Sequence, residues 1–163
     1  HVKPMLEEGY ANAVIGILTA AYFFSIAFGA SLSPRISRIF RRRHTMTLAA
    51  AFACLAGFQI ALALQGSIVG FVTVFILYSV FLGVSETPVS SILHRCVEDR
   101  QRSTMLSLRS LVQQLGAALG LILAGFIAEV YSTPTAWVIG SVFLVLAVLL
   151  ISILAKRLTS END

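Results

Sequence analysis

Long apolar segments alternate with short polar ones along the whole chain. Each apolar segment is long enough to cross the roughly 30 Å hydrocarbon core of a bilayer as an α-helix, at about 1.5 Å per residue. The pattern therefore predicts an all-α polytopic membrane protein whose membrane unit is residues 11–155. The expected spans are residues 12–33, 46–64, 68–93, 105–130 and 136–155. Residues 1–10 would form an extracytoplasmic lead-in, and residues 156–163 a cytoplasmic tail.

The composition supports a membrane location. Of the 163 residues, 57% are hydrophobic and only 12% are charged, and the mean hydropathy is +0.86. A water-soluble domain of this size could not bury so much apolar surface. We therefore expect the lipid bilayer as the main partner and no nucleic acid, although the formal net charge is +4.

Basic residues gather in the expected loops. The segment PRISRIFRRRH, Pro34–His44, contains Arg35, Arg38, Arg41, Arg42 and Arg43 between two apolar spans. A second basic loop is HRCVEDRQRST, and two more basic residues follow the last span, whereas Lys3 alone lies on the opposite side. Because cytoplasmic loops carry the excess of Lys and Arg, the N-terminus is expected outside and the C-terminus in the cytoplasm, in the cell (inner) membrane.

Polar groups inside the first span share one helical face. Tyr22, Ser25 and Gly29 follow spacings of three and four residues. This face is consistent either with a contact between helices, where small residues permit close approach, or with the wall of a polar cavity.

Two charged residues within the apolar spans are candidates for a functional role. Glu86 stands near the inner end of the third span, and Pro88 beside it favours a kink. Arg109 lies in the first turns of the fourth span, where its guanidinium could reach the interface or bind Glu86 or an anionic substrate. The orientation brings both residues toward the cytoplasmic side of adjacent spans, so a pairing is geometrically allowed. Glu86 is then either a structural partner or a proton-coupling group.

Small residues also mark the fourth span. Gly116 and Gly120 form a GxxxG motif, which Gly125 extends, and this pattern predicts close packing between helices. The spans at residues 46–64 and 136–155 are almost purely apolar and are expected to face lipid.

The sequence does not suggest an enzyme, a metal site or a cofactor. His1, His44 and His94 are far apart, and Cys54 and Cys96 are expected to be packing residues. No serine and histidine, and no pair of carboxylates, occur at a workable catalytic spacing.

The order of these features resembles the C-terminal half, helices 8 to 12, of a major facilitator superfamily transporter. The segment GASLSPRISRIFRRR is similar to the family's loop signature, in which Arg35 and Arg38 match while Pro34 and Ser37 replace an acid and a glycine. The segment ILHRCVEDRQRSTMLSLRSLVQQLGAALG resembles the connection between helices ten and eleven, with Arg102 leading into the helix. The third resemblance is the apolar character of the second and fifth spans.

The resemblance implies five helices of a six-helix half-bundle and thus part of a secondary transporter. Such proteins move a small-molecule solute by alternating access between two halves, so the missing N-terminal half would be a partner. The alternative is a non-transporting membrane module or truncated relative that associates through its glycine-rich helix. Expected substrate or coupling residues are Tyr22, Ser25, Tyr78, Glu86, Arg109, Gln113 and Gln114. Expected gate or topogenic residues are Arg35, Arg38, Arg41, Arg42, Arg43 and Arg102.

Overall fold

The chain folds into five α-helices. The computed structural model describes residues 2–40, 44–97 and 101–160. The helices are α1 Val2–Ile39, α2 His44–Ala63, α3 Ile68–Cys96, α4 Arg102–Val130 and α5 Thr133–Ser160. Each of them contains a segment long and apolar enough to cross a membrane. The predicted all-α, multi-pass membrane class is confirmed.

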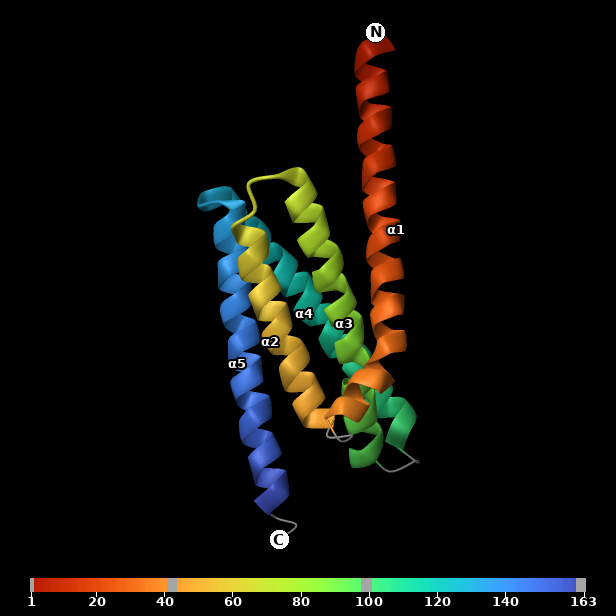
Figure 1. Cartoon of the computed structure of the whole chain (residues 1–163), viewed down its shortest axis with the longest axis vertical. Helices are drawn as coiled ribbons and strands as arrows, with labels where there is room; N and C mark the ends of the chain where they lie inside the picture. Colours follow the sequence, from red (N-terminus) through yellow and green to blue (C-terminus); the bar gives the residue numbers. More distant parts are fainter. Residues whose placement is uncertain (1, 41–43, 98–100, 161–163) are drawn as a thin grey trace.

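The helices run alternately up and down, which gathers the basic connections at one end. Figure 1 shows the ends of α1, α3 and α5 and the starts of α2 and α4 at the same end of the bundle, opposite the start of α1. Three close helix pairs, α1 with α3, α3 with α2, and α2 with α5, form the body of the bundle, and α4 packs closely only against α5. Arg35 and Arg38, near the end of α1, and Arg102, at the start of α4, therefore lie toward a single end of the bundle.

Two glycines permit the close contact between α1 and α3. A Cβ atom added to Gly29 would overlap the backbone carbonyl of Val80, and one added to Gly83 would overlap the backbone carbonyl of Ile26. Small residues at such positions let helix backbones approach, which is how helices associate in lipid. The face predicted from Gly29 is thus a helix contact.

A buried hydrogen bond lies beside this contact. The hydroxyl of Ser33, which is fully buried, donates to the backbone carbonyl of Val84 at 2.8 Å. Ser33→Ala is expected to lower the free energy of unfolding by about 1 kcal/mol, because a buried hydrogen bond typically contributes that much. Ser31→Ala is the matched control, since the exposed Ser31 bonds only the Phe28 carbonyl of its own helix. Denaturant unfolding in micelles, followed by circular dichroism, measures the free energy of unfolding of both variants. An equal decrease in both would contradict the stabilising role of the Ser33 hydrogen bond.

The second helix is buried on one side, where it packs, while Met46 and Ile60 are exposed, so the prediction that it faces lipid stays a prediction. The buried apolar side chains in the described part of the chain are Leu48, Ala51, Leu55, Ala56 and Leu62 of α2 and Val84 of α3. Helix α2 packs closely against both α3 and α5. A helix that is apolar on every side does not reveal in its sequence which face meets protein and which meets lipid.

Two predicted connections are shorter in the structure. Helix α1 begins at Val2, within the expected lead-in, and continues to Ile39, so the expected loop at Pro34 is largely helical. Proline is tolerated inside a membrane helix when neighbouring groups satisfy the freed backbone. Helix α5 begins at Thr133, before the expected start at residue 136. The hydroxyl of Ser132 accepts a hydrogen bond from the backbone N–H of Thr135 at 3.3 Å. The predicted turn before α3 is confirmed: Ser67 caps the helix by accepting from the N–H of Gly70.

Candidate functional site

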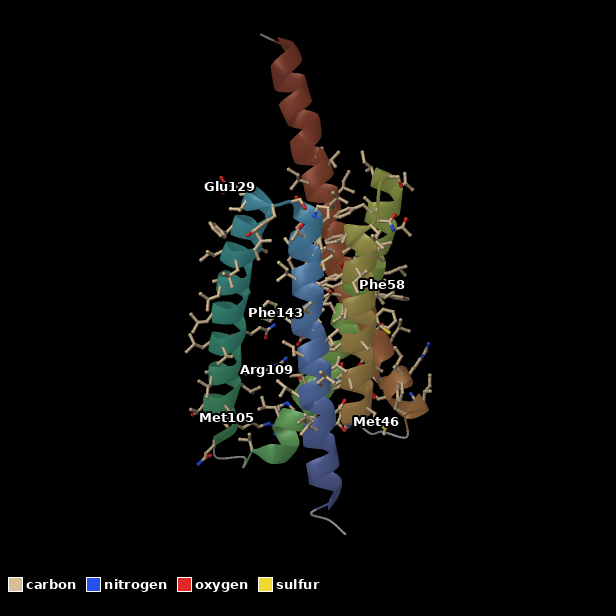
Figure 2. The ribbon with its side chains drawn as sticks, turned by 90° about the vertical axis from the view of Figure 1, so that its left-hand side faces the viewer. Met46, Phe58, Met105, Arg109, Glu129 and Phe143 are labelled. Atoms are coloured by element: carbon tan, nitrogen blue, oxygen red, sulfur yellow. The ribbon has the colours of Figure 1, made fainter. Side chains whose placement is uncertain are left out.

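Helix α4 stands apart from the rest of the bundle and leaves a crevice beside it. None of its residues is buried, and Figure 2 shows α4 diverging from α5 between Glu129 and Met105. Two hollows occupy the crevice, one of about 880 Å³ and one of about 500 Å³. We call the first the outer cavity and the second the inner cavity.

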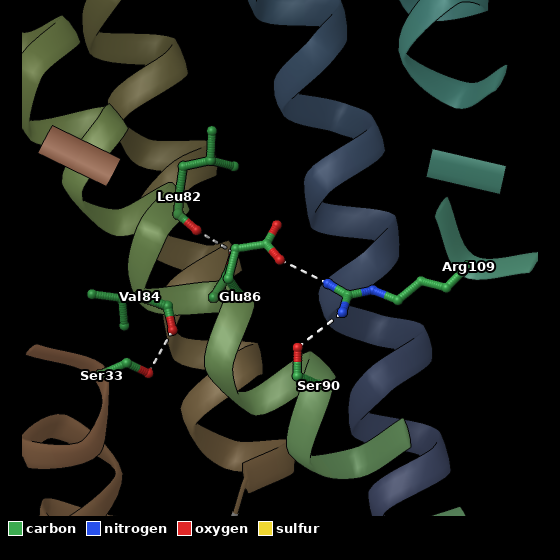
Figure 3. A network of polar contacts seen from close by, with 7 residues as sticks. Ser33, Leu82, Val84, Glu86, Ser90 and Arg109 are labelled. Atoms are coloured by element: carbon green, nitrogen blue, oxygen red, sulfur yellow. Dashed lines mark hydrogen bonds and ion pairs between the residues drawn. The ribbon is translucent and has the colours of Figure 1, made fainter. Parts of the chain in front are cut away.

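A charged cluster crosses the crevice from α4 to α3. Nη2 of Arg109 donates to Oε2 of Glu86 at 2.7 Å, and Nη1 donates to Oγ of Ser90 at 2.9 Å (Figure 3). Glu86 and Ser90 are four residues apart and so lie on one face of α3. Hydrogen bonds between charged groups are shorter and stronger than neutral ones. The pairing that the sequence left open is therefore present.

The ion pair borders the inner cavity, whose walls are otherwise mostly apolar. The remaining lining residues are Phe52, Leu82, Ser85, Val89, Leu93, Met105, Leu108, Val112 and Gln113. The Glu86 side chain is 42% exposed and the Arg109 side chain 23% exposed, so the carboxylate is the more accessible partner. An ionisable pair at membrane depth that faces a cavity is typical of a functional site.

A second polar contact joins the same two helices at the same end. Nε of Arg102 donates to Nδ1 of His94 at 3.0 Å. Helices α3 and α4 are not closely packed against one another. Polar side chains, and not a packed apolar face, therefore connect α4 to α3.

The outer cavity contains Tyr78, together with Gln59 from α2. Both side chains line this cavity, and Oε1 of Gln59 is buried and has no hydrogen-bond partner in the described part of the chain. Gly116, Gly120 and Gly125 line the opposite wall. Nothing lies within 4 Å of a Cβ atom added to any of these three glycines. No helix of the described chain meets them, and the predicted contact at this motif stays a prediction.

The polar residues of α1 lie away from the crevice. Tyr22 stacks on Phe75 of α3 with ring centroids 5.9 Å apart and lines a separate hollow of about 350 Å³. Ser25 is buried on the helix face that carries Gly29. Of the two interpretations left open for this face, the structure supports the helix contact at Ser25 and Gly29.

The other predicted residues are dispersed. Gln113 lines the inner cavity, whereas Nε2 of Gln114 contacts Oγ of Ser110 on the outside of α4 at 3.4 Å. Arg35 and Arg38 are exposed at the basic end. Arg41, Arg42 and Arg43 lie outside the described residues.

Two residues of the site were missed in the sequence. Ser90 could have been found from its spacing of four residues after Glu86. Gln59 is the single amide in the otherwise apolar α2, and that isolation was the available signal. In the described ranges, no group of three potential metal ligands occurs.

Five membrane-crossing helices with a polar pair beside an open crevice define a multi-pass α-helical membrane protein. The chain matches the family model of the Major Facilitator Superfamily over residues 2–163 and belongs to that family. Members of this family transport small solutes and are not enzymes. The comparisons found no match among curated proteins and none among solved structures.

Proposed function

We propose that this chain is part of a secondary active transporter that moves a small solute across a membrane by alternating access. The observation that carries the proposal is the Glu86–Arg109 ion pair, which joins two helices that are not otherwise closely packed. Alternating access requires helices that can separate and rejoin around a midplane crevice. A polar connection suits this requirement, because it can break without disrupting a packed apolar core.

The transporter includes further membrane helices, which correspond to the missing N-terminal half and the rest of this half-bundle. The support is the outer cavity, which is lined by the unpartnered Gly116, Gly120 and Gly125 and has the small-residue surface that a helix needs for close approach. The concentration of basic residues at one end supports a cytoplasmic C-terminus and an extracytoplasmic N-terminus in the cell membrane.

Each polar residue then has a role. Glu86 is the coupling group, Arg109 holds it in place, and Tyr78 and Gln113 face the solute path in the two cavities. Arg35, Arg38 and Arg102 contribute to a cytoplasmic gate, while Arg41, Arg42 and Arg43 orient the spans.

Glu86→Gln in the intact transporter is expected to remove the dependence of transport on a proton gradient, because an amide neither gains nor loses a proton. A transported solute is first identified by comparing solute uptake in cells with and without the protein, and its flux is then measured in proteoliposomes at several pH values. Glu129→Gln is the control, since this exposed acid lies at the far end of α4 from Arg109 (Figure 2). A pH profile unchanged by Glu86→Gln would refute the coupling role, and absence of any responsive solute would refute transport.

A further inference from the structure

We infer that the inner cavity binds an organic carboxylate with an apolar body, and that its carboxylate replaces Glu86 at Arg109 while Glu86 takes up a proton. This inference rests on the proposed function and specifies its substrate class and coupling.

The guanidinium of Arg109 supplies the anion site. It has only donors and remains protonated at any physiological pH. Its two terminal nitrogens are aimed at the Glu86 carboxylate and the Ser90 hydroxyl, at 2.7 Å and 2.9 Å. A ligand carboxylate at the same place would keep the Ser90 contact and would restore the hydrogen bond that Glu86 gives up.

The exposed fractions of the two side chains indicate which of them leaves the ion pair when a ligand binds. Glu86 is 42% exposed and Arg109 is 23% exposed. A carboxylate that leaves the pair can become neutral by accepting a proton, whereas a displaced arginine would stay charged in an apolar setting, at high cost. An anionic ligand that displaces Glu86 from Arg109 is therefore favoured over a cationic ligand that displaces Arg109 from Glu86.

The cavity walls define the rest of the ligand. Beside the charged pair, Ser85 and Gln113, the lining consists of aliphatic side chains, Met105 and the ring of Phe52. A volume of about 500 Å³ is within the range of small-molecule sites, which are mostly apolar with a few placed polar groups. The expected body is hydrocarbon or aromatic, because sugar hydroxyls would find few partners here.

The charges balance if one proton binds together with each anion. Among the described residues lining this cavity, Glu86 and Arg109 are the only titratable or charged ones. The empty site is neutral, with one carboxylate and one guanidinium. The occupied site is also neutral, with a protonated Glu86, the guanidinium and the ligand carboxylate. The ligand and the proton thus enter together, and their transport is electroneutral.

The test uses phenylbutyrate and its uncharged analogue phenylbutyramide as probes. The full chain is placed in lipid nanodiscs, and calorimetric titrations are run in buffers of different ionisation enthalpy, which count protons taken up. Phenylbutyrate is expected to bind at least about tenfold more tightly than the amide, a difference of about 1.4 kcal/mol. It should do so with uptake of about one proton per bound anion, as linkage requires.

Three variants separate the roles of Arg109 and Glu86. Arg109→Gln should lose the preference for the acid, and Arg109→Lys should keep part of it, which distinguishes loss of charge from loss of structure. Glu86→Gln should still bind phenylbutyrate but without proton uptake. Circular dichroism of each variant confirms that the helices are retained.

The outcomes discriminate between this inference and transport itself. Equal binding of acid and amide, a preference that survives Arg109→Gln, or absence of binding would overturn the anion site, even if another solute is transported. Binding with proton uptake, but no flux of any tested solute, phenylbutyrate included, in proteoliposomes of the intact transporter, would support the site and contradict the proposed function.

Discussion

Replacing Gly83 by leucine is expected to prevent α1 and α3 from packing together and so to abolish the stable bundle. Even a Cβ atom at this position would overlap the backbone carbonyl of Ile26. A backbone atom inside a helix cannot move aside as a flexible side chain can. The helices would have to separate, and the buried Ser33–Val84 hydrogen bond and the Tyr22–Phe75 stacking would be lost with the contact.

The expected loss is at least about 3 kcal/mol, the upper end of the usual cost of overpacking. Size-exclusion chromatography and thermal unfolding in micelles measure it. Gly57→Leu is the matched control, because Gly57 lies in α2 with nothing within 4 Å of an added Cβ atom. If Gly83→Leu and Gly57→Leu unfolded at the same temperature, the close contact between α1 and α3 would be contradicted.

Gly120→Leu is expected to have the opposite pattern: no loss of stability in the chain alone, but loss of transport by the intact protein. Gly120 has no neighbour within 4 Å of an added Cβ atom and lines the outer cavity. A leucine there would meet nothing in this chain. It would occupy the surface against which we propose that a further helix packs.

Thermal unfolding of the chain and solute flux by the intact transporter are measured on the same variant. Gly57→Leu again serves as the control and should leave both properties near those of the unsubstituted protein. Destabilisation of the chain by Gly120→Leu would show that α4 packs more closely than described. Full transport activity would show that the outer cavity does not receive another helix.

Hydropathy and charge were sufficient to predict the helices and where basic residues gather, because both depend on local composition. The contacts between helices depend on which side of each helix is turned inward, and α2 illustrates the difficulty. Its Leu55 is buried and its Ile60 is exposed, although both are large and apolar. The continuation of α1 through Pro34 was also not predictable, since proline usually ends a helix in water but is tolerated in a packed membrane bundle.

The candidate site was partly predictable. Glu86 and Arg109 could be proposed as neighbours because charged groups inside a membrane need partners and both lie toward the same end. The spacing of Tyr22, Ser25 and Gly29 predicted one face, either a helix contact or a cavity wall, and α1 turns this face toward α3. Polarity identifies residues that avoid lipid, but it does not distinguish a cavity wall from a helix contact.

The short turn at Tyr131 and Ser132 can act as a hinge about which α4 rotates as a rigid helix. This helix has no buried residue, and its polar contacts to α3 lie far from the turn. Arg109 is 21 residues from Val130, or about 32 Å along the helix axis. A rotation of only about 5° at the turn would displace Arg109 by about 3 Å, enough to break a hydrogen bond of ordinary length. Opening the ion pair therefore requires little angular movement and no repacking of the α1, α2 and α3 core.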